Sequence, residues 1–491
     1  MYDKTSQIIK MNGKVTKPLQ TYKGVRQGCI LSPRLFNIFL RDLPDIFDQK
    51  CNPVKIGNTD VSCLMFADDI VLLSESQEGL HNCLKRLEEY TSQWDMTVNK
   101  KKTKIMIIQN TGRKTIANYT YEGQTLEVVE KYKYLGTIVS KTGNFKLNHA
   151  YLRSKGLKAR YAITRNIGLD CKASTLMKLF QKMVEPILLY NCEIAQASIP
   201  NSWDEEKFKL KMWEDKEIDK VTKGYMRQIL GVHKKTTIMG LRAELGMYPL
   251  SLNIYIQIIK YWTRLLSTEN ILLQEAHIDN LERMRRNKPC WIKTVMFILK
   301  TCGLQQIDIK EISEKESTFH RETRKKLTEA YHENWKMEAE KMSDGKMAFY
   351  TKMKKNFHFE TYLDKIPRIE RKSITKLRLS CHSLPIEKMR YQKIQRVERK
   401  CTICKENEIG DEWHYLTRCK QEDLNTTRKE FIQLVKNIQP QLENFTTEDL
   451  MIYAISMNDT LIQVPAATFA KNLLQTYSDV TEKEEGSCSI M

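Results

Sequence analysis

Two adjacent aspartates stand between two apolar runs, and this pattern constrains the N-terminal part of the chain most strongly. The runs are Cys63 to Phe66 and Ile70 to Leu73, and Asp68 and Asp69 lie between them. Two short apolar runs joined by a tight polar turn predict a β-hairpin with both carboxylates at its tip. Adjacent like charges are unfavourable unless a cation neutralises them, and aspartates are ordinary ligands of divalent metals. The alternative is an acidic turn without a ligand, since so short a motif also recurs by chance.

A glycine-punctuated loop that runs into a predicted helix lies upstream of this hairpin. Gly24 and Gly28 allow the backbone to approach a ligand closely. Ser32 is suited to cap the helix and Pro33 to stand in its first turn. The apolar residues that follow at helical spacing predict one apolar helix face: Leu35, Ile38 and Phe39. A second tight turn is expected at Asn12-Gly13, nearer the N-terminus.

The loop and the hairpin together resemble a known family. With Phe66-Ala67-Asp68-Asp69 some 40 positions after Gly24-Val25-Arg26-Gln27-Gly28, the chain closely resembles the palm of reverse transcriptases, specifically those of non-LTR (LINE-type) retrotransposons. Further segments resemble this family in its order: the Lys-Thr-Lys segment at 99–106, the primer-grip hairpin at 132–136, the thumb helix at 185–193, and the region after the thumb at 229–233 and 244–250. One departure is Asn191, where the family more often has glycine.

This resemblance implies RNA-directed DNA polymerisation. A primer 3′-hydroxyl then attacks the α-phosphate of a nucleotide, and two Mg²⁺ ions supply most of the electrostatic stabilisation. Asp68 and Asp69 would be metal ligands. The resemblance assigns the other positions as follows: Arg26, Gln27 and Gly28 against template and nucleotide, Lys102 or Lys104 near the leaving pyrophosphate, and Leu135 and Gly136 at the primer strand. The two lysines could equally belong to a solvated strand end.

The family also has a catalytic aspartate on a strand upstream of the loop. Only 23 residues precede Gly24, and Asp3 stands where the family has the end of a helix. Fingers and an N-terminal endonuclease are likewise expected to be missing. We therefore expect a truncated, partial palm with little or no polymerase activity in the isolated chain. The alternative is a non-catalytic remnant that binds nucleic acid through its thumb and through a zinc knuckle, a small zinc-binding module predicted further along the chain.

Beyond about residue 148 the pattern becomes helical, with apolar residues at three- and four-residue spacing such as Leu176, Leu179, Phe180 and Met183. An α+β chain is expected, in which an antiparallel sheet with helices precedes a mainly α-helical thumb region and a small zinc knuckle. The expected parts are a partial palm at 1–147, a helical thumb and post-thumb region at 148–309, a charged helical linker at 310–370, a basic Cys-Cys-His-Cys knuckle at 371–425, and a polar, partly helical tail at 426–491.

Four potential zinc ligands lie within 19 residues: Cys401, Cys404, His414 and Cys419. Three thiolates and one imidazole complete a tetrahedral shell, which is typical of a structural Zn²⁺ site. The alternative is four unrelated residues in a chain with 13 cysteines. Cys381 and His382 could compete as ligands but lack the knuckle spacing. The resemblance agrees, because non-LTR reverse transcriptases often end in such a module after a Leu-Arg-rich helix, here at 376–379.

Basic residues exceed acidic ones by 80 to 60 over the 491 residues, a formal charge of +20 that favours a polyanionic partner. Residues 371–420 hold 13 Lys or Arg against 6 Asp or Glu, an excess of seven. Trp413 and Tyr415 flank His414 and would stack on bases of single-stranded nucleic acid, or pack against the metal loop instead. The expected partners are an RNA template with a DNA primer, or another single strand.

The N-terminus lacks a secretory signal pattern, and the most apolar window, 183–199, carries Glu185, Pro186 and Glu193 and is too short to cross a bilayer. We therefore expect no membrane partner and an intracellular protein with reduced thiols, nuclear or cytoplasmic rather than secreted.

Overall fold

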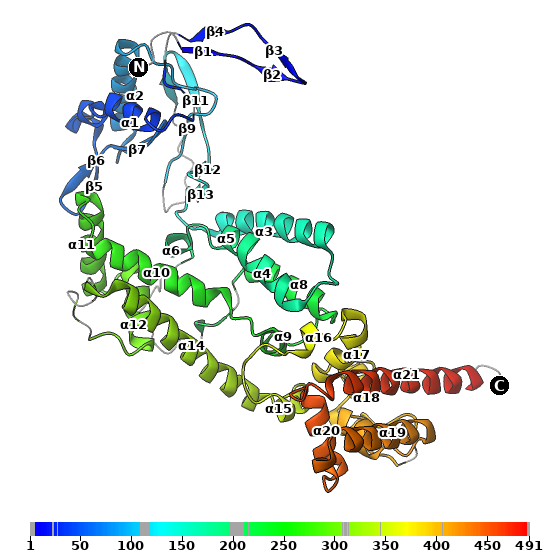
Figure 1. Ribbon diagram of the computed structural model, residues 1–491. Helices are drawn as coiled ribbons and strands as arrows, with labels where there is room; N and C mark the ends of the chain where they lie inside the picture. The colour runs from blue at the N-terminus through cyan, green and yellow to red at the C-terminus, as the bar shows by residue number, and fades with distance from the viewer. Residues whose placement is uncertain are drawn as a thin grey trace. The chain divides into compact units, whose positions relative to one another are not determined.

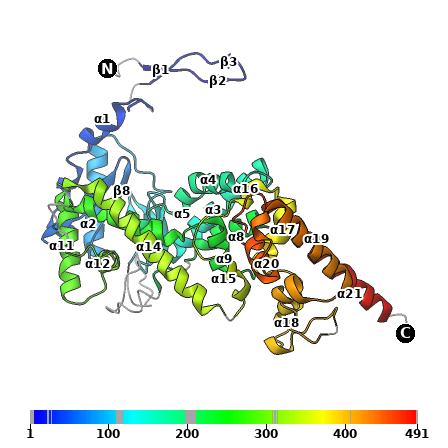
Figure 2. The same ribbon diagram turned by 60° about the horizontal axis from the view of Figure 1, so that its bottom comes forward.

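The computed structural model describes residues 5–21, 24–26, 28–108, 118–196, 211–214, 216–306, 308, 312, 314–343, 345–404 and 406–488 (Figures 1 and 2). The chain divides into two compact units. Unit 1 comprises Met1–Asn144 with Thr268–Arg285, and unit 2 comprises Phe145–Ser267 with Arg286–Met491. Both helices and strands are present, which agrees with the predicted α+β class.

Unit 1 begins with a two-stranded ribbon (Figure 1). Its strands pair antiparallel, β1 (Thr5–Gln7) with β4 (Leu19–Thr21) and β2 (Lys10–Met11) with β3 (Lys14–Val15). Asn12 and Gly13 connect β2 to β3 with φ of 49° and 78°. Two central residues with positive φ are what a type I′ hairpin turn needs, so the turn predicted at Asn12-Gly13 is confirmed.

The rest of the described part of unit 1 consists of short strands, two long helices and three shorter helical elements. Its helical elements are α1 (Ser32–Phe39), η1 (Leu43–Ile46), η2 (Gln49–Cys51), α2 (Gln77–Gln93) and α11 (Ile271–Arg285). Its strands are β5 (Val54–Ile56), β6 (Thr59–Val61), β7 (Cys63–Phe66), β8 (Asp69–Leu72), β9 (Lys104–Ile105), β10 (Tyr119–Tyr121), β11 (Gln124–Val128), β12 (Lys131–Tyr134) and β13 (Thr137–Ser140). Strand β11 lies between antiparallel β10 and parallel β9, and the other strands form antiparallel pairs.

Helix α2 organises the core of unit 1. Ser76 caps it, because its hydroxyl accepts a hydrogen bond from Gly79 N at 3.0 Å. Apolar residues at helical spacing on α2 then pack against the β9–β11 sheet and the segment after α1. The buried residues of this core are Leu40, Leu43, Leu84, Leu87, Tyr90, Ile105, Tyr119, Tyr121 and Leu126.

Helix α1 differs from the prediction in two respects. Leu31, not Ser32, stands at the N-cap, and the Ser32 hydroxyl instead donates to the carbonyl of Arg26 at 2.6 Å. Pro33 does lie in the first turn, as expected. The predicted apolar face is turned outward: Leu35, Ile38 and Phe39 are all exposed, Ile38 by 61%. Phe36, in α1, and Leu40, which directly follows the helix, pack on the core instead. The buried side of α1 is therefore not the side formed by the three predicted residues.

Helix α11 belongs to unit 1 although it follows residue 267 in the chain. Its Glu275 carboxylate accepts a hydrogen bond of 2.9 Å from Asn58 N, in the turn between β5 and β6. The expected division placed this segment within the helical region 148–309. The expected and observed divisions differ because this hydrogen bond joins residues 217 positions apart, and a contact over that range leaves no local pattern in the sequence.

Unit 2 is helical. Its first helices are α3 (Lys146–Ile167), α4 (Ala173–Met183), α5 (Glu185–Leu188), α6 (Cys192–Ala195), α8 (Asp219–Leu230), α9 (Ile238–Leu245), α10 (Leu250–Leu266), α12 (Ile292–Thr301) and α14 (Glu316–Lys341). The later ones are α15 (Ala348–Met353), α16 (Tyr362–Lys365), α17 (Arg368–Arg378), α18 (Pro385–Tyr391), η3 (Arg396–Glu398), η4 (His414–Arg418), α19 (Glu422–Ile438), η5 (Pro440–Leu442), α20 (Thr447–Ser456) and α21 (Gln463–Cys488). No helix among the described residues is long and apolar enough to span a bilayer.

The segment expected to be one thumb helix is broken into α5 and α6 at Asn191. This residue has a φ of 53°, in the left-handed region. Glycine adopts that conformation without a steric penalty, and asparagine tolerates it better than most other residues. The departure from glycine at this position is therefore compatible with the same backbone.

Helix α14 packs as part of a core rather than as a solvated linker. Its buried residues recur every four positions along one side: Phe319, Thr323, Leu327, Tyr331, Trp335 and Ala339. This stripe lies against α10, α12 and α9. The charged helical linker expected at 310–370 is therefore packed on this side, because the dense charges occupy the other sides of the helix.

A buried charge network joins distant parts of unit 2. The guanidinium of Arg378, in α17, is fully buried and lies 2.8 Å from Glu244 and 3.1 Å from Glu360. It also donates to the carbonyls of Ile455 and Ser456 at 2.6 and 2.9 Å. One side chain thus ties α9, α17 and α20 together, while α21 packs along α17 and α19 (Figure 2).

Candidate functional sites

The predicted aspartate hairpin forms. Strands β7 and β8 pair in the register Met65↔Ile70 and Phe66↔Asp69, so Ala67 and Asp68 make a two-residue turn. Ala67 has a φ of 52°, which is unfavourable for a residue with a Cβ atom. Backbone strain of this kind gathers at functional sites in proteins.

The pleat of this hairpin directs the carboxylates away from the core. Met65 and Ile70 lie opposite each other and pack on the core of unit 1. Because side chains alternate between the two faces of a strand, Asp69 lies on the other face with Phe66. Asp68 and Asp69 are both exposed. The tip therefore offers two accessible carboxylates on a rigid, half-buried support.

The β12–β13 hairpin lies within electrostatic reach of this tip. Burial and then the charge of Asp69 raise the pKa of Tyr134, the last residue of β12, above its ordinary value. Leu135 and Gly136 connect β12 to β13 with φ of 44° and 82°. They form the tight, partly exposed turn at which the resemblance expects the primer strand.

The two candidate lysines have different surroundings. Lys104 forms an ion pair with Glu127, with Nζ and Oε2 at 2.7 Å. Lys102 is exposed, and its ammonium has no ion-pair partner among the residues that the structure describes. Its carbonyl accepts a hydrogen bond of 3.3 Å from the Tyr132 hydroxyl, beside β12. Of the two ammonium groups, that of Lys102 is therefore the more available to a phosphate.

The loop before α1 is described in part. Arg26 and Gly28 are both exposed, and Gly28 has a φ of 81°, which suits glycine. Gln27, which the resemblance also places near the template and nucleotide, lies outside the described residues.

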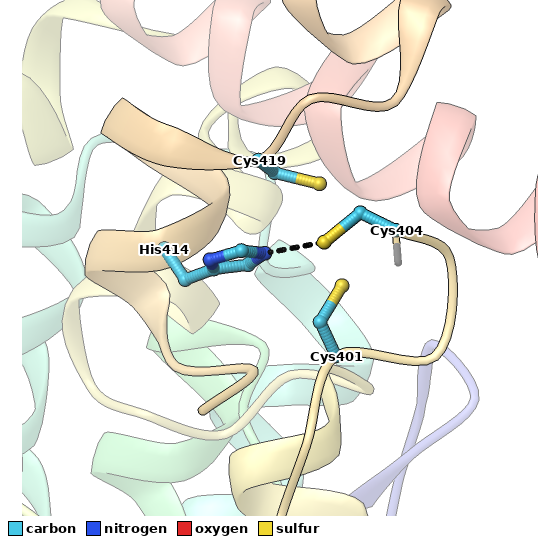
Figure 3. A group of neighbouring side chains, drawn as sticks. All are labelled: Cys401, Cys404, His414 and Cys419. Carbon is cyan, nitrogen blue, oxygen red and sulfur yellow. Dashed lines mark hydrogen bonds between the residues drawn. The ribbon is translucent and has the colours of Figure 1, made fainter. Parts of the chain in front are cut away.

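The four predicted zinc ligands come together in unit 2. The ligand atoms of Cys401, Cys404, His414 and Cys419 all lie within 4.8 Å of one another, and Figure 3 shows the three sulfurs and the imidazole converging on one point. Cys404 Sγ lies 3.3 Å from His414 Nε2. A tetrahedral ion with metal–sulfur bonds of ~2.3 Å holds its ligand atoms roughly 4 Å apart. The donor set and its spacing therefore fit one tetrahedral ion.

Glu408, which the sequence did not single out, orients the histidine. Its carboxylate lies 3.0 Å from His414 Nδ1 and 3.2 Å from Arg418 Nε. A proton held on Nδ1 leaves Nε2 free to face the sulfurs, the arrangement that metal-bound histidines usually have. A hydrogen bond from Cys419 lowers the pKa of Cys401, whereas that same bond raises the pKa of Cys419 and burial raises that of Cys404. Without a cation, the pocket thus favours one thiolate, at Cys401.

Local backbone contacts build this pocket. Cys401 N donates to the Glu408 carbonyl at 2.8 Å, and Cys419 N donates to the His414 carbonyl at 2.7 Å. Gly410 permits the close approach, because a Cβ atom there would lie 3.1 Å from the backbone of Cys401. Buried Arg428, from α19, donates to the Cys419 carbonyl at 2.9 Å. Short-range backbone hydrogen bonds thus form the pocket, and Arg428 of α19 stabilises it.

The competing ligands Cys381 and His382 are engaged elsewhere. His382 Nε2 lies 3.0 Å from the Glu412 carboxylate, and its Nδ1 accepts from Leu384 N at 3.3 Å. Burial raises the pKa of Cys381 above its ordinary value, although hydrogen bonds with Thr236 and His233 offset part of that rise. The structure thus leaves both outside the cluster.

The two aromatic residues beside His414 differ in exposure. Tyr415 is fully buried, and its ring packs 5.2 Å from that of Tyr477. Its predicted stacking on a base is therefore wrong, and the alternative of packing beside the metal loop holds. Trp413 is partly exposed, and its ring contacts Phe349 at 5.0 Å and the ammonium of Lys352 at 5.0 Å.

The basic stripe at 371–420 is less available than its composition suggests. Arg371 and Arg378 are buried and bound to backbone carbonyls or carboxylates within unit 2. Arg390 pairs with Glu387 at 2.6 Å. Part of the excess charge therefore holds the fold together, and only the remainder can face a polyanion.

Comparison with known proteins identifies relatives of the N-terminal part. Residues 2–139 match the family of reverse transcriptases (RNA-dependent DNA polymerases). The chain is 28% identical over 185 residues to the RNA-directed DNA polymerase from mobile element jockey of Drosophila funebris, covering 35% of this chain and 19% of that protein. It is 31% identical over 150 residues to the retrovirus-related Pol polyprotein from type-1 retrotransposable element R2 of Nasonia vitripennis, covering 28% and 14%. The chain thus spans less than a fifth of the length of these relatives.

Proposed function

Because residues 2–139 of this chain are a reverse transcriptase domain of the non-LTR retrotransposon type, we propose that it acts in RNA-directed DNA synthesis, with Asp68 and Asp69 as ligands of Mg²⁺. The observation that carries this proposal is the exposed pair of carboxylates at the tip of β7–β8. When bound, Mg²⁺ stabilises the charge that develops on the phosphate oxygens during nucleotidyl transfer. The proposed substrates are a primed RNA template and deoxynucleoside triphosphates.

The neighbouring residues have supporting roles in this proposal. Lys102 supplies a positive charge to the leaving pyrophosphate, since its ammonium is exposed and Lys104 is paired with Glu127. The Leu135-Gly136 turn contacts the primer strand through its backbone. Arg26, Gln27 and Gly28 contact the template and the nucleotide.

We further propose that Cys401, Cys404, His414 and Cys419 hold a structural Zn²⁺ ion. The closed set of three sulfurs and one nitrogen supports this, as does the Glu408 carboxylate behind His414. The segment 371–425 would then act as a basic zinc knuckle that docks nucleic acid.

A second candidate function is nucleic-acid binding without catalysis. One observation favours it: in the described part of the chain, the Cys/His cluster is the only group of three or more metal-binding side chains. The hairpin tip supplies two carboxylates, and a metal held by two ligands is held weakly. We therefore expect little or no primer extension from the isolated chain.

Three measurements on one set of proteins separate the two candidates. The set is the full chain, Asp68→Asn, Asp69→Asn, and a control, Asp45→Asn, which removes an exposed carboxylate of η1. The measurements are Mn²⁺ binding by electron paramagnetic resonance, extension of a primed RNA template in Mg²⁺, and affinity for the same template and primer.

Polymerase function predicts that Mn²⁺ binding and primer extension both disappear in Asp68→Asn and Asp69→Asn and remain in Asp45→Asn. Binding of the template and primer without Mn²⁺ binding or extension would instead establish the non-catalytic candidate. Extension that survives both hairpin substitutions would contradict the assignment of these aspartates.

A further inference from the structure

A cavity of about 210 Å³ lies in unit 2, next to the Cys/His module. Its walls come from α15, α18, η3 and the residues just before η4. The side chains that decide its chemistry are four cations and two aromatic rings: Lys346, Arg390, Arg396, Arg399, Phe349 and Trp413. The other charged lining residues are Glu387, Asp411 and Glu412.

The three acidic residues are occupied by neighbours. Glu387 accepts hydrogen bonds from Arg390 at 2.6 and 3.1 Å. Glu412 accepts from Ser380 at 2.7 Å and contacts His382 at 3.0 Å. Asp411 accepts from the backbone of η4 at 2.9 Å and lies 3.4 Å from Arg396. These carboxylates position the walls of the cavity and leave part of its positive charge unbalanced.

Two of the four cations, Lys346 and Arg399, have no carboxylate within ion-pair distance in the described part of unit 2, although Glu387 acts on both through its charge. Arg399 donates to the carbonyls of Ile394 and Ile386 at 2.9 and 3.1 Å. The Lys346 ammonium donates to the carbonyl of Lys235 at 2.8 Å. Arg390 and Arg396 lie close enough to Arg399 to repel it, and the charge of Glu387 offsets part of that repulsion. An anion would relieve the remainder.

Trp413 adds an aromatic surface to the same wall. Its side chain is partly exposed, whereas its indole N–H is buried. The Phe349 ring, at 5.0 Å, keeps the indole in place.

The size of the cavity limits what enters it. Pockets for small organic ligands usually measure roughly 300–1,000 Å³. A cavity of about 210 Å³ suits one anionic group and the ring beside it, as part of a longer molecule that continues outside.

We propose that this cavity binds one nucleotide of a single-stranded nucleic acid, with its backbone phosphate at Lys346, Arg396 and Arg399 and its base or sugar against Trp413. The inference rests on the proposed function, which supplies the strand. Basic grooves combined with aromatic side chains are the usual way in which proteins hold single strands without reading their sequence. The sequence predicted that Trp413 contacts a base of a single strand, and in this proposal it does so as part of a cavity wall.

The test compares two double variants that lose the same charge. Lys346→Gln/Arg396→Gln removes two cations from the cavity. Arg321→Gln/Lys429→Gln removes two exposed cations from α14 and α19. Affinity for a twelve-nucleotide RNA and the DNA of the same sequence is measured by fluorescence anisotropy at several salt concentrations, with inorganic phosphate as a competitor. Zinc content and thermal unfolding verify that each variant folds.

The cavity variant is expected to bind both strands about tenfold more weakly and to lower the salt slope of log K by about 0.7 for each backbone phosphate that the variant no longer neutralises. The control is expected to retain the slope of the unmodified chain. A 4-thiouridine strand is expected to crosslink to the peptide that contains Trp413. Tighter binding of RNA than of DNA would show that the cavity also reads the ribose, and competition by phosphate would assign it to the phosphate group.

Equal losses of affinity in both double variants, without the crosslink, would overturn the inference by assigning the effect to overall charge. A chain that binds neither strand would contradict the proposed function, whatever the cavity does. Trp413→Leu keeps an apolar side chain against Phe349 and removes the aromatic ring. We expect it to weaken binding about threefold, and unchanged affinity would exclude the ring as a contact of the strand.

Discussion

The two candidate metal sites of this chain are built in opposite ways. The hairpin of unit 1 presents Asp68 and Asp69, which are adjacent in sequence and exposed. The cluster of unit 2 gathers four ligands over 19 residues, and Cys401, His414 and Cys419 are buried. The difference matches the two uses of metals in proteins, since catalytic sites keep positions open to substrate whereas structural sites are closed by protein ligands.

The same contrast extends to the surroundings of the two sites. Behind the hairpin tip lie apolar side chains of β7 and β8. Around the Cys/His cluster lie buried charged groups, among them Glu412 and Arg428, each with hydrogen-bond partners. Loss of a ligand should therefore disturb function at the hairpin and the fold at the cluster.

The largest effect is expected from Cys419→Ser. Structural zinc contributes about 10–16 kcal/mol to folding in zinc-finger peptides, so loss of a thiolate should abolish stoichiometric zinc and unfold the module around η4. Zinc content by mass spectrometry and hydrogen exchange of residues 396–428 measure this. Cys381→Ser is the matched control, because its sulfur is outside the cluster. Full zinc occupancy in Cys419→Ser would refute the assigned ligand set.

A smaller but still large effect is expected from Arg378→Gln. Removal of one partner from a buried ion pair costs about 3–5 kcal/mol, because Glu244 would remain buried without its counter-charge. Denaturant unfolding followed by fluorescence should show unit 2 unfolding at a lower midpoint. Lys372→Gln, on the exposed side of α17, should change the free energy by less than about 0.5 kcal/mol. Equal effects of the two substitutions would show that the network does not stabilise unit 2.

Glu408→Gln tests the support of the zinc site without removing a ligand. Loss of a carboxylate that orients a metal-bound histidine typically lowers metal affinity about 10- to 100-fold. Competition with a zinc chelator measures this change. Glu406→Gln, whose carboxylate pairs with Lys420 at 3.1 Å, is the control. If both variants hold zinc equally tightly, His414 does not depend on Glu408.

The smallest effect is expected at the hairpin of unit 1. Ala67→Gly removes the Cβ atom from a residue with a φ of 52° and should relieve left-handed strain by about 1 kcal/mol or less, since glycine also gains freedom in the unfolded chain. Chemical denaturation followed at Trp94 measures it. A clear loss of stability would mean that the alanine side chain packs more than its exposure indicates.

Short-range patterns predicted local structure well. The aspartate hairpin and the Asn12-Gly13 turn are confirmed, because their cause lies within a few residues. The four Cys/His ligands also come together as predicted. In contrast, the sequence did not indicate that the apolar face of α1 is exposed or that one side of α14 is buried, because burial depends on what packs against a helix and not on its own composition alone.

Several residues of the sites had no distinguishing signal in the sequence. Glu408 is one of four acidic residues between Cys404 and His414, and only the folded loop selects it for His414. The sequence likewise does not show which of Lys102 and Lys104 is available, because Lys104 is paired with Glu127, which lies 23 positions away in the chain. Tyr415 and Trp413 are two positions apart, yet one is buried and the other lines a cavity.

The order of residues was enough to locate the groups on which the proposed function rests: a carboxylate pair on a hairpin, a set of potential zinc ligands, a basic excess and a resemblance to reverse transcriptases. Which of its charges remain available depended on tertiary packing. Arg378 meets Glu244 across 134 residues and is neutralised within the core, whereas Arg399 and Lys346 reach a cavity with no carboxylate within ion-pair distance among the described residues. The physical reason is that a charge is neutralised by whatever lies within a few ångströms of it, and chain separation does not limit that distance.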